Sequence, residues 1–131
     1  MKKDIPTPEV KHVTVVIKPE QPDQHWSVHL VNGNEKQIKN VLVASRGYSE
    51  KKQVTQETSV LRHFLEDIAA KSSKQIELID TEVFHLFNEF DVTYYLDDEL
   101  HFKKFVFVPE SIHVGNLSYN DIMATDVVVH S

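Results

Sequence analysis

Hydrophobic and polar residues alternate along several short stretches of the chain, and this period of two is typical of half-buried β-strands. The clearest case covers residues 25–30, where Trp26 and Val28 share one face with the leucine that follows and the intervening polar residues share the other. Alternation returns over residues 90–96 and 100–108. We therefore predict three strands here, each with one buried face.

Turn-forming residues mark the connections between these segments. Residues 11–18 are rich in β-branched side chains and end at Pro19, which lacks a backbone donor. Asn32-Gly33-Asn34 tolerates positive φ and predicts a turn into a strand over residues 38–45, which Gly47 ends. The acidic segment 97–99 predicts a hairpin turn, and the two lysines at 103–104 predict a β-bulge in the strand that follows it.

The middle of the chain allows two interpretations. Leu61, Phe64, Leu65 and Ile68 recur at the spacing of an amphipathic helix, which indicates a short helix around residues 60–70. The preceding residues are β-branched or carry hydroxyl groups and form no capping box, which indicates a strand instead. We favour a strand through about Phe64, followed by a turn over residues 67–73.

These elements add up to an all-β protein of about seven short strands, without βαβ alternation. An immunoglobulin-like β-sandwich is the fold class that this pattern favours. Residues 1–9, with two prolines, are expected to form an extended lead-in, and residues 10–112 the sandwich domain. Residues 113–131 are expected to form a C-terminal extension that is a strand or partly disordered.

Composition and charge limit the function. The chain has 131 residues, of which 40% are hydrophobic, and no cysteine, so one core without disulfides is expected. The basic start lacks the apolar run of a signal peptide, and no segment is long enough to span a membrane, so we expect a cytoplasmic protein without membrane contact. The formal net charge of −6 argues against a nucleic-acid partner.

Motifs for catalysis and cofactor binding are missing from the sequence. It contains no GxSxG, GxGxxG or GxxxxGK[ST] segment, so we expect no enzyme, no catalytic residue and no cofactor. His25 and His29 would be about 13 Å apart on a strand, too far to share a metal ion, and we expect both to face solvent. The eight histidines leave one alternative open, a metal or small-ligand site that gathers His63, His85 or His101 from neighbouring strands.

A surface site and a partner class remain as the functional predictions. Arg46, Tyr48, Arg62 and His63 are the polar residues that we expect at a surface site near strand ends. The function predicted is a non-enzymatic protein-interaction or self-association module, so the partner is another protein or a second copy. Exposed strand edges that extend a partner's sheet are the expected contact.

Four segments of the chain carry a family resemblance: residues 40–48 (NVLVASRGY), 61–64 (LRHF), 90–92 (FDV) and 103–107 (KKFVF). Together they resemble a family of short bacterial proteins that are sometimes catalogued as an alpha subunit of phenylalanyl-tRNA synthetase. The resemblance covers most of the chain and implies an immunoglobulin-like sandwich without an established active site. The family name implies an accessory role linked to translation. The chain lacks the length and the FRxE-type motif of a synthetase core, so a catalytic aminoacyl-tRNA synthetase is not expected.

Overall fold

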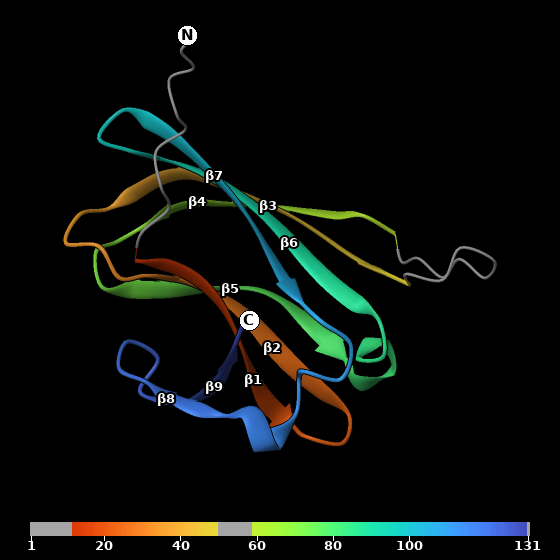
Figure 1. Cartoon of the computed structure of the whole chain (residues 1–131). Coiled ribbons are helices and arrows are strands. Elements are labelled where there is room, and N and C mark those ends of the chain that lie inside the picture. The colour runs from red at the N-terminus through yellow and green to blue at the C-terminus, as the bar shows by residue number, and fades with distance from the viewer. Residues whose placement is uncertain (1–11, 50–58, 131) are drawn as a thin grey trace, which may run out of the picture.

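The computed structural model describes residues 12–49 and 59–130 of the chain (Figure 1). These residues form nine β-strands and two short 3-10 helices, and neither helix is long and apolar enough to cross a membrane. The all-β prediction is therefore confirmed. The elements are β1 (Val13–Gln21), β2 (His25–Asn32), β3 (Ile38–Tyr48), β4 (Leu61–Ile68), β5 (Ser72–Asp80), η1 (Thr81–Val83), β6 (Phe87–Leu96), β7 (Glu99–Phe107), η2 (Val114–Asn116), β8 (Ser118–Asn120) and β9 (Thr125–Val129).

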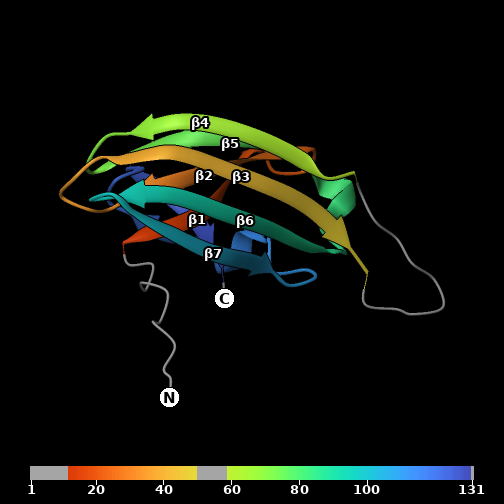
Figure 2. The ribbon, with the colours of Figure 1, turned by 90° about the horizontal axis from the view of Figure 1, so that it is seen from above.

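The strands form two antiparallel sheets, which makes the protein a β-sandwich. One sheet has five strands in the order β5-β2-β1-β9-β8, and the other has four in the order β4-β3-β6-β7. Figure 1 shows the two sheets as separate layers. Figure 2 shows the four-stranded sheet broadside, with β5, β2 and β1 behind it.

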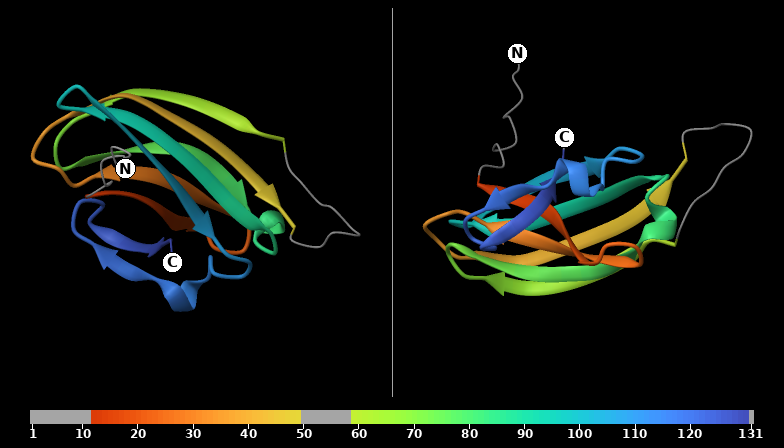
Figure 3. Two further views of the ribbon diagram at one scale, coloured as in Figure 1. Left: turned by 45° about the horizontal axis from the view of Figure 1, so that its top comes forward. Right: turned by 90° about the horizontal axis from the view of Figure 1, so that it is seen from below.

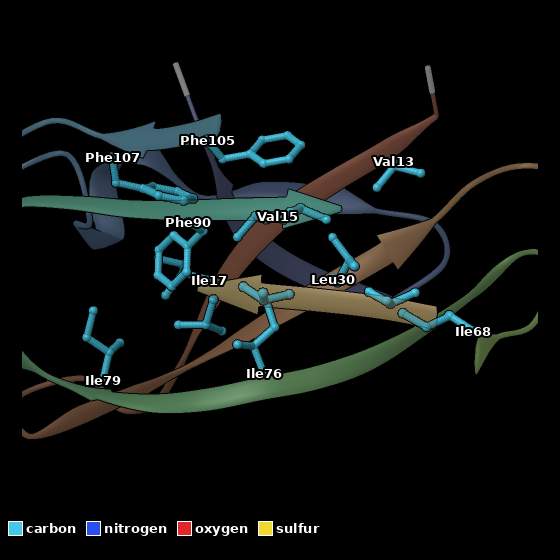
Figure 4. Close-up of a cluster of buried hydrophobic side chains, with 14 of the residues drawn as sticks. Val13, Val15, Ile17, Leu30, Ile68, Ile76, Ile79, Phe90, Phe105 and Phe107 are labelled. Carbon is cyan, nitrogen blue, oxygen red and sulfur yellow. The ribbon is translucent and has the colours of Figure 1, made fainter. Parts of the chain in front are cut away.

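Apolar side chains from both sheets fill the space between the layers. Trp26, Val28 and Leu30 of β2 point inward as predicted, and each is at most 2% exposed. The indole Nε1 of Trp26 donates a hydrogen bond to the Pro22 carbonyl oxygen at 3.0 Å, so the polar atom of the ring is satisfied. Figure 4 shows the core, whose larger members also include Ile17, Ile38, Ile68, Ile76, Ile79, Phe90, Tyr94, Phe105 and Phe107.

The hairpin between β6 and β7 turns where the acidic segment predicted it. Asp97 and Asp98 have φ angles of 52° and 64°, and positive φ at both central positions is the signature of a type I′ turn. The pairing of β6 with β7 has no register shift, so the bulge predicted at the two lysines is wrong. Alternation looked broken because Phe102 lies on the outer face of the sheet, whereas Phe105 lies in the core.

A bulge occurs instead in β4, and it explains the helix-like spacing of this segment. Because residues 61–68 form a strand, the helix alternative is wrong. The strand runs on to Ile68 rather than ending at about Phe64, and the turn at Ala70 and Lys71 lies within the predicted range of 67–73. The register between β3 and β4 shifts next to Glu66, whose φ is 63°. This shift resets the alternation, so that Leu65 and Ile68 both face the core although they are three residues apart.

Two strands continue past the residues that were predicted to end them. β1 extends through Pro19, which is tolerated because β9 pairs with β1 only at Val16 and Ile17 and leaves that side of Pro19 without a neighbouring strand. β3 likewise continues through Gly47, whose backbone pairs with Asn88 of β6.

The C-terminal residues supply the two remaining strands of the five-stranded sheet. β9 pairs with β1, and β8 pairs with β9 (Figure 3). A second, smaller core lies on the side of this sheet away from the main core and contains Val16, Val31 and Val127, with Ile122 and Met123 packed against them. The predicted N-terminal lead-in, residues 1–9, lies outside the described residues.

One buried asparagine ties the two sheets together at the ends of β2 and β4. The side-chain amide of Asn32 lies within 3.0–3.1 Å of the carbonyl oxygens of Lys36, Ile68 and Ala69. Its Oδ1 accepts a hydrogen bond from the backbone N–H of Asn34 at 3.0 Å. Because Asn32 is fully buried, these bonds satisfy a polar group that would otherwise destabilise the fold.

Candidate functional site

Three of the four residues predicted for a surface site lie together on the outer face of the four-stranded sheet. Arg46 and Tyr48 are two residues apart on β3 and therefore share this face. Arg62 of β4 pairs with Ala44, which lies two residues before Arg46 on the same face of β3. His63 follows Arg62 directly, so its side chain points the other way, toward the space between the sheets.

A buried carboxylate organises this cluster. Glu89 of β6 has a side chain only 4% exposed, and it accepts hydrogen bonds from Arg46 Nε at 3.1 Å and from the Tyr48 hydroxyl at 3.2 Å. Lys104 Nζ lies 3.5 Å from the same carboxylate. Burial opposes ionisation of Glu89, but Arg46, Lys104 and Tyr48 together hold its pKa below the usual value of 4.5.

A second carboxylate lies beside the first one in a different environment. Burial raises the pKa of Asp91 above 3.8, and the negative charge of Glu89 adds to this effect. Its Oδ1 is buried and receives no hydrogen bond from the described residues. Asp91, Arg62 and Lys104 line one surface depression of about 320 Å³. Cations and anions are mixed here, and among the described residues of the cluster no nucleophile stands beside a general base.

The fourth predicted residue, His63, belongs to a separate polar cluster that bridges the sheets. Its Nε2 lies 2.8 Å from Glu77 Oε1 of β5, and the hydroxyl of Ser45 on β3 donates to the same oxygen at 2.7 Å. A cavity of about 230 Å³ lies beside Ser45 and Glu77 and has walls that include Ile79 and Phe90. The cluster therefore links β3 and β4 of one sheet to β5 of the other.

A similar set of groups lies on the outer side of the five-stranded sheet. The hydroxyl of Ser27 donates to Glu20 Oε2 at 2.6 Å and lies 2.7 Å from His29 Nε2. His29 is only 9% exposed, so the prediction that it faces solvent is wrong, because its side of the sheet is itself covered: Val16, which pairs with His29, is buried in the second core. Burial lowers the pKa of His29, and the charge of Lys18 adds to this shift.

Both clusters contain a serine, a histidine and a glutamate, but neither has the order of a catalytic triad. In a triad the imidazole lies between the hydroxyl and the carboxylate, so that it can take the hydroxyl proton. Here Glu77 lies between Ser45 and His63, and Ser27 lies between Glu20 and His29. Neither cluster therefore has the geometry of a Ser-His-Asp triad.

Exposed apolar side chains cross all four strands on the outer face of the four-stranded sheet. Backbone pairing aligns Phe64 of β4 with Leu42 of β3, and it continues through Thr93 of β6 to Phe102 of β7. The next row toward the β6–β7 turn contains Tyr95 and Leu100, which pair with each other. We call five of these residues the apolar band, and each is between 38% and 58% exposed: Leu42, Phe64, Tyr95, Leu100 and Phe102.

The sequence did not reveal the apolar band as a surface feature. Its five members come from four strands, and only the cross-strand register brings them together. Phe64 was part of the helix-like spacing, and the β-bulge predicted at residues 103–104 would have placed Phe102 on the same face as Phe105. One signal was present, since Phe102 and Phe105 are an odd number of residues apart and must lie on opposite faces of an unbroken strand.

The described residues offer no evident metal site. Within residues 12–49 and 59–130, no three histidine, aspartate or glutamate side chains come together in a group that could hold a metal ion. No protein-family model and no curated protein matches the chain. The family resemblance carried by four sequence segments therefore stays a prediction.

Proposed function

We propose that this protein is a non-enzymatic protein-interaction or self-association module that uses the outer face of its four-stranded sheet. The observation that carries this proposal is the apolar band. A large side chain offers roughly 150–250 Å² of surface, and the band residues expose about half of theirs, which amounts to on the order of 500 Å². Monomeric proteins rarely expose contiguous apolar surface beyond a few hundred Å² unless it serves in binding.

The strand edges, which the sequence favoured as the contact, are less suitable. β4 and β5 have register shifts against their neighbours, and β8 has only three residues. The remaining edge strand, β7, carries the adjacent Lys103 and Lys104. Bulges, short strands and lysines are the usual features that prevent edge-to-edge pairing. The broad face of the sheet is therefore the better contact surface.

We also infer that the sandwich is of the immunoglobulin-like type. The support is the order of β1 to β7: lettered A, B, C, C′, E, F and G, they form one sheet E-B-A and one sheet C′-C-F-G. β9 and β8 extend the first sheet beyond strand A. One departure is that the buried Trp26 lies on β2, whereas immunoglobulin domains have their buried tryptophan on strand C.

The proposal is tested by removing the apolar band without disturbing the core. A Phe64→Ser/Phe102→Ser double variant is compared with Leu78→Ser, a control with an equally exposed leucine on the other sheet. Sedimentation velocity measures self-association, and capture on immobilised protein measures other partners. We expect association that the control retains and the double variant loses. A wild-type protein that binds neither itself nor another protein through the band contradicts the proposal.

A further inference from the structure

We propose that the cavity beside Ser45 and Glu77 binds a small organic ammonium ion, that is, a charged primary amine on a compact apolar body. The cavity lies between the two sheets, next to the edge strands β4 and β5. The apolar band lies on the outer face of the four-stranded sheet, so the two sites are separate. This inference goes beyond the proposed contact surface and does not depend on it.

The walls of the cavity are mainly apolar and come from both sheets. Ile79 of β5 and Phe90 of β6 line it and are at most 6% exposed (Figure 4). Leu61 of β4 pairs with the buried Ser45, so both side chains point into the space between the sheets, yet Leu61 is 49% exposed. An inward-facing leucine that solvent reaches marks the mouth of the cavity. The apolar body of a ligand would cover it.

The volume of the cavity limits the ligand to a small molecule. An apolar cavity of roughly 150 Å³ is sufficient for benzene. This cavity measures about 230 Å³. It therefore has room for roughly six to ten non-hydrogen atoms, which is the size of a single ring with a short amine-bearing arm.

The polar end of the cavity offers hydrogen-bond acceptors whose neighbours are already used. A carboxylate only accepts, so His63 Nε2 and the Ser45 hydroxyl both donate to Glu77 Oε1. Glu77 Oε2 receives no hydrogen bond from the described residues. Asn88, which is 5% exposed, also lines the cavity, and its amide nitrogen donates to two backbone carbonyl oxygens at 3.0 and 3.2 Å. Its Oδ1 therefore remains as a second acceptor, and a ligand that donates hydrogen bonds complements both.

The charges around the cavity favour a cation as this donor. Glu77 and Asp80 both line it. Among the described wall residues the only arginine or lysine is Arg46, whose Nε binds the Glu89 carboxylate on the outer face of the sheet. The Glu77 side chain is only 14% exposed, so water screens its charge weakly. An ammonium group would form a charge-assisted hydrogen bond with Oε2, which is stronger than a bond from a neutral donor.

A titration of the wild-type protein with benzylamine, followed by NMR at pH 8, tests the site. At this pH the amine is charged and imidazoles are ordinarily neutral, so His63 does not compete as a cation. The backbone amide shifts of Ser45, Glu77 and Phe90 should change and saturate, with a dissociation constant on the order of 1 mM for a ligand of this size. Benzyl alcohol lacks the charge and benzoate reverses it, and each should bind at least tenfold more weakly.

Glu77→Gln separates the charge from the shape of the site. The glutamine keeps an oxygen that can accept from Ser45 and His63, but it places an NH₂ donor where Oε2 was. We expect this variant to bind benzylamine at least tenfold more weakly and to lose most of the preference for the amine over the alcohol. Glu99→Gln, at an exposed residue after the β6–β7 turn, removes the same charge and should bind benzylamine as the wild type does.

Each result either supports the proposed ligand or overturns it. Equal binding of benzylamine and benzyl alcohol by the wild type overturns the ammonium ion as the ligand. Benzylamine that does not bind, or that shifts only amides away from the cavity, overturns the site. If circular dichroism shows that Glu77→Gln does not fold, the comparison of the three ligands on the wild type decides. None of these outcomes affects the proposed function, because the apolar band is untouched in every variant.

Discussion

Replacing Phe102 and Phe105 by alanine, one at a time, distinguishes the two faces of β7 by their energetics. The Phe105 side chain is completely buried, packs edge-on against the His130 ring at 4.7 Å and leaves a cavity when truncated. Phe→Ala at such a site costs about 3–5 kcal/mol. Phe102 is 49% exposed, and full burial of a phenylalanine stabilises by about 1.5–3 kcal/mol, so its truncation should cost roughly 1 kcal/mol.

The assay is urea unfolding at low protein concentration, where the monomer dominates. If Phe105→Ala does not fold, Phe105→Leu and Phe102→Leu give the same comparison with smaller decreases in the free energy of unfolding. A second series at rising protein concentration reports on self-association. Another folded copy that binds only the folded state raises the unfolding midpoint by mass action. We expect the wild-type midpoint to rise with concentration, and the Phe102→Ala midpoint to rise much less.

Equal decreases in the free energy of unfolding for the two variants in the dilute series would contradict the assignment of Phe102 to the outer face. They would mean that Phe102 is buried within the monomer and that the alternation along β7 has been assigned to the wrong faces. The apolar band would then lose one of its two phenylalanines.

Three further variants test the interior polar groups. Asn32→Asp replaces a buried donor with a carboxylate that faces carbonyl oxygens, so we expect the free energy of unfolding in urea to fall by about 3 kcal/mol or more at neutral pH. The decrease should be smaller in mild acid, where the carboxyl group can donate again. Equal decreases at the two pH values would contradict this expectation. Burial raises the pKa of Tyr94 to about 12, and its hydroxyl has no hydrogen bond among the described residues. Tyr94→Phe should therefore leave the midpoint of thermal unfolding unchanged or raise it. A clear decrease would reveal a hydrogen-bond partner of the hydroxyl. Because burial lowers the pKa of His29, the unfolded chain takes up a proton first, and stability should fall as the pH drops from about 6.5 toward the pKa of the folded state. His29→Gln should reduce this fall, and an unfolding free energy with an unchanged pH dependence would show that His29 is not responsible.

The sequence predicted those parts of the fold that depend on local pattern. Alternation along β2 and the acidic turn after β6 needed only neighbouring residues, and both predictions agree with the structure. The helix-like spacing at Leu65 and Ile68 was misleading because a bulge in β4 changes which face each residue takes. A bulge depends on the partner strand, and the sequence of β4 alone does not identify that partner.

The candidate site, too, was predictable only where it depends on the pattern of neighbouring residues. Arg46 and Tyr48 alternate on one strand, so the sequence could place them on a common face. Glu89, which binds both, lies 41 residues or more further along the chain, and only the register of β3 with β6 brings it close. The apolar band depends on three such registers at once. Alternation identifies two faces of a strand but does not say which of them another molecule covers.

The central claim is that the outer face of the four-stranded sheet is the contact surface of this protein. Backbone amide chemical shifts, followed by NMR as the protein is diluted, test it most directly. We expect the shift changes to be concentrated on β3, β4, β6 and β7 around Leu42, Phe64 and Phe102. Changes confined to the edge strands β5 or β8, or shifts that do not depend on concentration and do not respond to any partner, would contradict it.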